Sequence, residues 1–301
     1  MKLTAKRRAM LGLRDSYAIK GGMVTAKTLD TGTDQLLCSV DNGVATITLN
    51  RPDKRNALSN ELTPALRQTL LTVEADPAVR CVVITGAGRA FCSGGDVSGM
   101  GGGAPSVPPD TPRPTLEDAV RRLQHGQETL TLRLFDLAKP TIAALPGAAA
   151  GAGMSIALAC DLRIAARSAF ITSAFANIGL SGDYGGSWLL TQLVGVARAK
   201  ELYYTSRRVG ADEGLALGIF NEVVADDELM ARARTLAESI AAGPPIALRY
   251  MKENLNRAVG ADLRTALALE ADRMVRCTRT DDHREAVQAF IGKRKPVFHG
   301  K

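Results

Sequence analysis

Residues 145–166 read LPGAAAGAGMSIALACDLRIAA, and this stretch decides the fold of the chain. It begins at the end of an apolar run, passes through glycines and alanines, and carries no charge before Asp161. Small residues at a strand–helix junction let two backbones approach closely, and the first N–H groups of such a helix point outward. The pattern predicts a strand at Thr141–Leu145, a helix over Gly151–Ala159 and another strand near Leu162–Ala165.

A second junction of the same kind lies upstream. The segment AFCSGGD (90–96) follows the strand-like run Cys81–Thr85. Tight packing explains either glycine-rich segment when it is taken alone. If the two segments face each other, their backbone N–H groups can bind one developing oxyanion from two sides.

The surrounding sequence alternates between strand and helix patterns. Apolar runs at Leu36–Val40 and Val44–Leu49 flank the turn sequence DNG (41–43), which predicts a β-hairpin. Ser59 is placed to cap a helix over Asn60–Ala75. Repetition of this alternation along the chain predicts an α/β fold whose strands are buried on both faces.

Three regions are expected along the chain. Residues 1–34 form a basic N-terminal extension, 35–225 a core domain, and 226–301 a helical C-terminal region. Breaks in the last region are predicted at GPP (243–245) and at Gly260, because proline and glycine end helices.

The net charge of +7 is concentrated at one end. Residues 1–30 carry +5, from these basic and acidic side chains: Lys2, Lys6, Arg7, Arg8, Arg14, Lys20, Lys27, Asp15 and Asp30. The nearly neutral remainder lacks the basic stripe and aromatic platform that nucleic-acid binding needs. The basic segment is interpreted as a solvated tail, with a targeting peptide or a true start at Met23 as alternatives. No apolar run is long enough to span a membrane.

The cysteines and histidines argue against a disulfide framework or a metal site. Five cysteines are widely spaced and form no C-x-x-C pair: Cys38, Cys81, Cys92, Cys160 and Cys277. This usage predicts reduced thiols in a cytoplasmic protein. The three histidines lie outside any metal-ligand spacing, so no metal is expected. The motifs of serine hydrolases, P-loop enzymes and Rossmann dehydrogenases are missing from the sequence.

Five motifs follow one another along the chain: NRPDKRNALS (50–59), ITGAGRAFCSGGDV (84–97), the 145–166 stretch, IGLSGDYGGSWLLTQLVG (178–195) and AFIGKRKPVF (289–298). In their order and spacing they resemble the signatures of the crotonase (enoyl-CoA hydratase/isomerase) superfamily, over about residues 35–298. The resemblance implies a spiral of ββα units with a helical C-terminal trimerisation region. It also implies a homotrimer or hexamer that acts on an acyl-CoA thioester. No cofactor is implied beyond the coenzyme A of the substrate.

The resemblance also implies a set of site residues. The backbone N–H groups of Gly95 and Ala152 would form the oxyanion hole, provided that Ala152 has a negative φ. Phe290 and Lys293 of a neighbouring subunit would complete the coenzyme A site. The other residues implied to hold the adenine and phosphates are Arg55, Ala57, Ser93, Asp96 and Val97. For Arg55 and Lys293, solvated surface charge is the alternative interpretation.

The acid–base positions depart from the hydratase pattern. The resemblance implies that Ser155 stands at the position of one hydratase glutamate. Phe175, or Ala174 if the register slips by one residue, stands at the position of the other. None of these side chains transfers protons in the ordinary way. Asp183 aligns with the single base of isomerase-type crotonases, and capping of the following helix is its alternative role. The expected activity is therefore double-bond isomerisation of an enoyl-CoA. Hydration with Asp183 and an ordered water, another crotonase reaction such as hydrolysis, decarboxylation or ring closure, and acyl-CoA binding without catalysis stay open.

Overall fold

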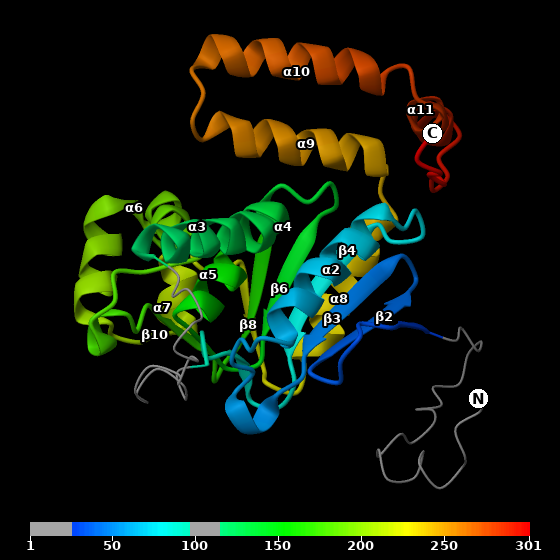
Figure 1. Ribbon diagram of the computed structural model, residues 1–301. Helices are drawn as coiled ribbons and strands as arrows, with labels where there is room; N and C mark the ends of the chain where they lie inside the picture. Colours follow the sequence, from blue (N-terminus) through cyan, green and yellow to red (C-terminus); the bar gives the residue numbers. More distant parts are fainter. Residues whose placement is uncertain (1–25, 97–114) are drawn as a thin grey trace, which may run out of the picture.

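The computed structural model describes residues 26–96 and 115–301 (Figure 1). Val97 and most of the 1–34 extension therefore lie outside the described residues. The strands are β1 (Lys27–Leu29), β2 (Leu36–Asp41), β3 (Val44–Leu49), β4 (Cys81–Gly86), β5 (Ala90–Cys92), β6 (Thr141–Leu145), β7 (Ala148–Ala150), β8 (Leu162–Ala166), β9 (Phe170–Thr172), β10 (Val209–Gly210) and β11 (Glu222–Val224). The helices are η1 (Pro52–Lys54), α2 (Leu62–Ala75), α3 (Leu116–Gln127), η3 (Glu128–Leu132), α4 (Arg133–Phe135), α5 (Ala152–Ala159), η4 (Ala176–Ile178), α6 (Gly186–Thr205), α7 (Ala211–Ala216), α8 (Leu229–Ala241), α9 (Pro245–Ala258), α10 (Leu263–Cys277) and α11 (Asp281–Ile291).

The larger sheet has the strand order β1-β2-β3-β4-β6-β8-β11. Its hairpin β2–β3 is antiparallel, and Asn42 and Gly43 both have positive φ, as a two-residue hairpin turn requires. From β3 onward the neighbours are parallel, and β4 and β6 are buried along their whole length. The predicted α/β fold with buried parallel strands is confirmed.

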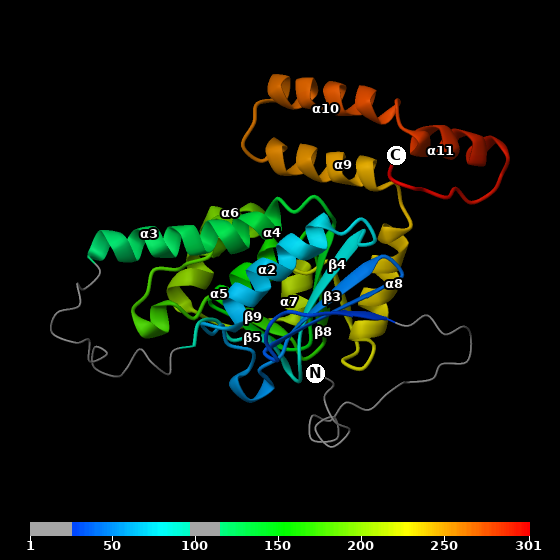
Figure 2. The same ribbon diagram turned by 45° about the vertical axis from the view of Figure 1, so that its right-hand side comes forward.

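A smaller sheet, in the order β10-β9-β7-β5, carries the two glycine-rich segments. Strands β5 and β7 pair in parallel, so the segment after β5 lies beside the segment after β7. Helix α5 follows β7 and is buried on all sides, which explains why residues 152–159 hold no charge. Helix α8 packs against the larger sheet, while α3 and α6 lie over α5 in both views (Figures 1 and 2).

Two helices differ from their predicted extents. Helix α2 begins at Leu62 rather than Asn60, although Ser59 Oγ does accept a hydrogen bond from the Leu62 N–H at 3.0 Å. The sequence is also helix-like over Leu116–Leu137, but this helix is interrupted by the π-helical turn η3 and ends at Phe135. Such single π turns occur often at functional sites.

Helices α9, α10 and α11 form an arm beside the core, and one buried ion pair anchors it (Figure 1). The Nζ atom of Lys252 on α9 lies 2.9 Å from Asp161 Oδ2 at the start of β8, and the Lys252 side chain is only 8% exposed. Asp161 also accepts hydrogen bonds from the N–H and hydroxyl of Thr141 on β6. Asp161 therefore has a structural role, fastening the arm to two core strands.

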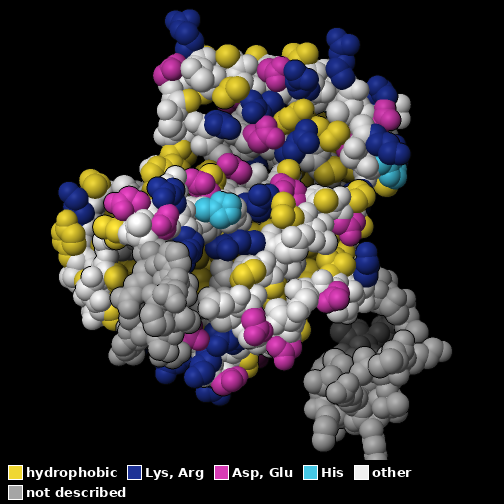
Figure 3. Space-filling view, viewed as in Figure 1, with side chains coloured by type: hydrophobic (Ala, Val, Ile, Leu, Met, Phe, Trp, Pro, Cys, Tyr) yellow, Lys and Arg dark blue, Asp and Glu magenta, His cyan; other side chains and the backbone are white. Residues whose placement is uncertain are grey.

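The arm exposes many apolar side chains, as the space-filling view shows (Figure 3). They include Met251, Leu255, Leu263, Leu267, Met274, Val275, Phe290 and Ile291. Apolar patches of this kind mark interaction surfaces. The same view shows basic and acidic side chains interspersed, without a basic stripe on this face. No helix within 26–96 and 115–301 has the length and hydrophobicity to cross a membrane.

We propose that the exposed apolar face of the arm is covered by neighbouring subunits in a trimer or hexamer. Multi-angle light scattering at micromolar concentration should give three or six times the mass of the chain, 31.8 kDa. Phe290→Ser should shift the assembly toward smaller species, because the Phe290 side chain is 85% exposed in the single chain. A wild-type monomer would contradict the proposal.

Candidate active site

The two glycine-rich segments are in backbone contact. A Cβ atom placed on Gly147 would lie 2.0 Å from the carbonyl oxygen of Arg89, and one on Gly153 would lie 2.2 Å from that of Cys92. Real Cβ atoms do not approach carbonyl oxygens this closely, so glycine is required at both positions. The predicted proximity of the segments is therefore present in the structure.

The contact brings the backbone around Gly95 next to that of Ala152. A Cβ atom on Gly94 would lie 3.5 Å from the Ala152 nitrogen. Leu58 is hydrogen-bonded to Gly94 and Asp96, so the N–H of Gly95 points away from Leu58. Ala152 is the first residue of α5, where an N–H has no intrahelical partner, and no side chain caps this helix.

The conformation of Ala152 is compatible with a functional N–H. The φ of Ala152 is not positive. This meets the condition stated above for an alanine at this position. Two adjacent N–H groups, one at the start of a buried helix, form a suitable cradle for an oxyanion.

Four of the predicted coenzyme A residues lie together beside this cradle. The Ser93 N–H donates to the carbonyl of Arg55 at 3.0 Å, which joins the segment 54–58 to the segment 93–96. Ala57 is buried and the Arg55 side chain is exposed. Asp96 is engaged by Arg51, whose guanidinium lies 3.0 Å from Asp96 Oδ2 and also donates to the Ala57 carbonyl. Asp96 thus supports the local structure, whatever ligand the site takes.

Phe290 and Lys293 lie apart from this cluster within one chain. They are at the end of α11 on the arm, distant from β5 in both views (Figures 1 and 2). Their assignment to the coenzyme A site of a neighbouring subunit stays a prediction. The predicted contact of Val97 with coenzyme A also stays a prediction, because Val97 lies outside the described residues.

Asp183 sits in a turn of unusual backbone conformation. Gly182, Tyr184 and Gly185 all have positive φ, and for Tyr184 this conformation is unfavourable. Helix α6 begins only at Gly186, and its cap residue Gly185 provides no side-chain hydrogen bond. The helix-capping role considered for Asp183 is therefore not seen.

The Asp183 carboxyl is poorly solvated. Its Oδ1 atom is buried and has no hydrogen-bond partner within the described residues. Burial raises the pKa of Asp183 to about 6, because the charged form loses solvation. A carboxylate with a pKa near neutrality is well suited to take up and return a proton.

Asp183 is held next to the first turn of α5. The Ser155 hydroxyl donates to the Asp183 carbonyl oxygen at 3.0 Å, and Ser155 lies one turn after Ala152. Ser155 is fully buried, and a Cβ atom on Gly186 would lie 2.3 Å from its Oγ. Phe175 is also buried, and its ring lies beside Gly151. Both positions that the resemblance assigns to hydratase glutamates are thus closed by packing.

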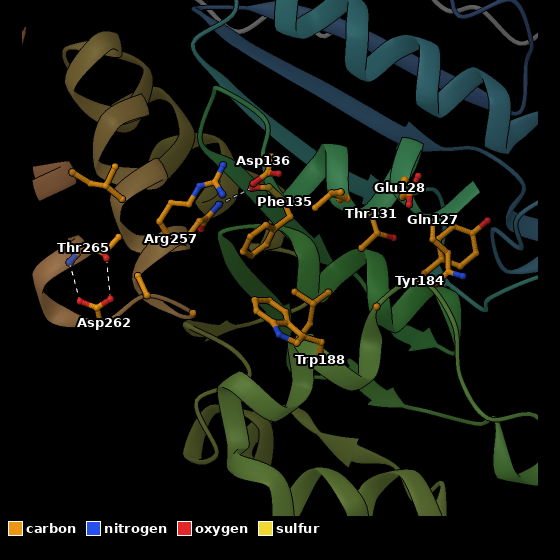
Figure 4. A pocket seen from close by; sticks show the side chains of 17 residues that line it. Gln127, Glu128, Thr131, Phe135, Asp136, Tyr184, Trp188, Arg257, Asp262 and Thr265 are labelled. Atoms are coloured by element: carbon orange, nitrogen blue, oxygen red, sulfur yellow. Dashed lines mark hydrogen bonds between the residues drawn. The ribbon is translucent and has the colours of Figure 1, made fainter. Parts of the chain in front are cut away.

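A cavity of about 840 Å³ is lined in part by Tyr184 and Gly185, the two residues that follow Asp183 in the chain (Figure 4). Its aromatic wall consists of Tyr184, Trp188 and Phe135, and the last two rings meet edge to face with centroids 5.6 Å apart. Arg257 and Asp262 line its far side, from the arm (Figure 4). The size and apolar lining suit a small-molecule pocket.

Sequence reasoning missed two residues of the site. Arg51 stands within the NRPDKRNALS motif, but only the folded structure pairs it with Asp96. Tyr203 lies on α6, stacked on Phe175 with ring centroids 6.0 Å apart, and no local pattern marks it as a neighbour of Asp183. Tyr203 lies inside the long helix α6, where its sequence neighbours do not indicate a functional role.

Comparisons with known proteins show the family of the chain. The family described as enoyl-CoA hydratase/isomerase matches residues 39–301. The 1,2-epoxyphenylacetyl-CoA isomerase of Escherichia coli K12 is 40% identical, over 88% of this chain and 98% of its own. The short-chain-enoyl-CoA hydratase of Clostridium acetobutylicum is 35% identical, over 87% and 96%. The crystal structure of an enoyl-CoA hydratase from Polaromonas sp. JS666 superposes with a TM-score of 0.80 at 34% identity, covering 87% of this chain and 99% of that one.

The fold and the paired glycine-rich segments define an α/β enzyme with the crotonase architecture. The chain belongs to the enoyl-CoA hydratase/isomerase family of the crotonase superfamily.

The raised pKa of Asp183 predicts a pH-dependent stability difference. A carboxyl whose folded-state pKa lies above its unfolded value stabilises the protein at low pH, and this contribution disappears as pH rises from about 4 to about 6. Asp183→Asn should therefore be more stable than wild type at pH 8, by up to about 2 kcal/mol, and equally stable near pH 4. Urea unfolding of both proteins at the two pH values measures the difference. Equal stability at pH 8 would show that the carboxyl is solvated.

Proposed function

We propose that this enzyme isomerises the double bond of an enoyl-CoA thioester, with Asp183 as the only proton carrier. The observation that supports this most is the poorly solvated Asp183 carboxyl beside the first turn of α5, with Ser155 and Phe175 at the two hydratase positions.

The proposed chemistry begins at the thioester carbonyl. The N–H groups of Gly95 and Ala152 bind its oxygen and stabilise the negative charge that develops on it. Asp183 takes a proton from the carbon next to the carbonyl of a 3-enoyl thioester, which leaves a conjugated enolate. Asp183 then returns the proton to the far carbon of the former double bond, and the new double bond is conjugated with the carbonyl. No oxidation state changes, so coenzyme A enters as part of the substrate and no redox cofactor is called for.

Packing around Ser155 and Phe175 favours isomerisation over hydration. Hydration needs a water that is activated on one side of the substrate and a proton that is delivered to the other. Neither closed position has space for a second carboxyl group, because Ser155 is enclosed by Gly186 and Phe175 is stacked on Tyr203. A hydratase with Asp183 and an ordered water is the second candidate, supported by the hydratases among the relatives.

Removal of one oxyanion-hole donor tests the first step. Ala152→Pro deletes the N–H, and proline is tolerated at the first position of a helix. We expect turnover to fall about a hundredfold or more, equivalent to about 3–4 kcal/mol of transition-state stabilisation. Steady-state kinetics gives the loss, and circular dichroism checks the fold. Unchanged turnover in a folded variant would remove Ala152 from the mechanism.

Asp183→Asn tests the proton carrier. The amide keeps the size of the side chain but cannot act as a base, so isomerisation of a 3-enoyl-CoA should fall by roughly 10²–10⁴-fold while binding survives. The matched control is Asp212→Asn, an exposed carboxyl that should leave turnover unchanged.

A substrate screen separates the candidate functions. Wild type, Asp183→Asn and Asp212→Asn are offered 2-enoyl-, 3-enoyl- and dienoyl-CoA esters, and mass spectrometry distinguishes water addition from isomerisation. Efficient hydration of 2-enoyl-CoA at the same rate in wild type and Asp183→Asn would overturn the isomerase proposal. Binding of the esters without turnover would identify a non-catalytic acyl-CoA-binding protein.

A further inference from the structure

The hydroxyl group of Tyr203 is buried without a hydrogen-bond partner in the described part of the chain. Its ring stacks on Phe175. Phenylalanine would preserve this stack without burying a polar group. An unsatisfied buried hydroxyl destabilises a protein by about 1–3 kcal/mol, so each one in a native structure calls for an explanation.

The hydroxyl lies inside the turn that carries Asp183. A Cβ atom on Gly182 would be 3.1 Å from the Tyr203 ring and 3.7 Å from its oxygen, and one on Gly186 would be 2.8 Å from that oxygen. Asp183 lies between these two glycines, and its Oδ1 atom is the other buried, unpartnered polar atom of the turn. Both unsatisfied groups are thus buried at this turn, where one is a donor and the other an acceptor, and the Asp183 carboxylate is close enough to raise the pKa of Tyr203.

We propose that Tyr203 is a positioning residue for Asp183, and that its hydroxyl donates a hydrogen bond to Oδ1 of the ionised carboxylate, after a side-chain rotation or through one water. This inference rests on the proposed function, since it assigns a role only if Asp183 is the base. The bond fixes one carboxylate oxygen under the turn and leaves the other free to meet the substrate. It also stabilises the ionised form of the base.

The surroundings of Tyr203 keep its hydroxyl protonated, so that it can donate a hydrogen bond. Burial and the nearby Asp183 carboxylate raise the pKa of Tyr203 to about 12, so its hydroxyl keeps its proton. Burial likewise raises the pKa of Tyr184, with Arg67 of α2 opposing the shift, and raises that of Cys92 on β5 to about 12. Tyr203, Tyr184 and Cys92 therefore keep their protons at pH values near the pKa of Asp183.

Tyr203→Phe removes the hydroxyl and retains the ring stack, and Tyr204→Phe is the matched control. Tyr204 is the next residue, and it is 74% exposed. Burial alone places the pKa of Asp183 at about 6, so a donated hydrogen bond should put the acid limb of the wild-type kcat/KM profile below 6. In Tyr203→Phe the pKa of this acid limb should rise by about one unit, and kcat/KM at pH 5 should therefore fall roughly fivefold. Tyr204→Phe should match wild type.

Three further readings decide the assignment. The KM of Tyr203→Phe should change little, and its melting temperature at pH 8 should fall, because the ionised Asp183 carboxylate loses its buried donor. In an Asp183→Asn background, Tyr203→Phe should have no additional effect on the residual rate. A wild-type pH profile in Tyr203→Phe, or an equal loss in the Asp183→Asn background, would overturn the inference. Full activity of Asp183→Asn would instead contradict the proposed function.

A direct titration covers the case in which Tyr203→Phe does not fold. Carboxyl carbon NMR of wild-type protein, with Asp183→Asn to assign the signal, gives the pKa of Asp183. A Tyr203 hydroxyl proton signal that shifts downfield as Asp183 ionises supports the hydrogen bond, and a hydroxyl signal that does not respond to this titration overturns it.

Discussion

The rest of the structure depends on one steric constraint, the direct contact between the backbones of residues 89–94 and 147–153. Glycine at positions 147 and 153 allows this contact, because any side chain would collide with the carbonyl groups of Arg89 and Cys92. The contact aligns β5 with β7 and places the start of α5 beside Gly95. The geometry of two N–H groups is thus fixed by packing of the main chain, so the proposed oxyanion hole is formed before any ligand binds.

Much of the fold was predictable, because local patterns encode it. The hairpin turn, the buried strands and the glycine-rich junctions each follow from a few adjacent residues. The exact start of α2 and the π turn η3 were not predictable, since both depend on how a helix end meets its neighbours. At the site, the sequence identified Asp183 through its motif. It gave no sign of Tyr203, which reaches the turn only through the packing of α6.

The environment of Asp183 illustrates a conflict between stability and chemistry. Loss of solvation raises the pKa of this carboxyl toward neutrality, and the same loss makes the ionised form destabilising to the fold. The positive φ of Tyr184 adds strain within the same turn. The buried first turn of α5 supports the strained segment through the hydroxyl of Ser155, which donates to the Asp183 carbonyl oxygen.

The ion pair between Lys252 and Asp161 has a consequence for the motion of the protein. The Asp161 carboxylate is bonded at once to α9 and to the backbone of Thr141, at the beginning of the strand that leads into the 145–166 stretch. If the helical arm swung away from the core, it would leave this carboxylate without its counter-ion in a partly buried place. The ion pair therefore holds the arm against the core. Hydrogen exchange in β6 should therefore report on fluctuations of the helical arm.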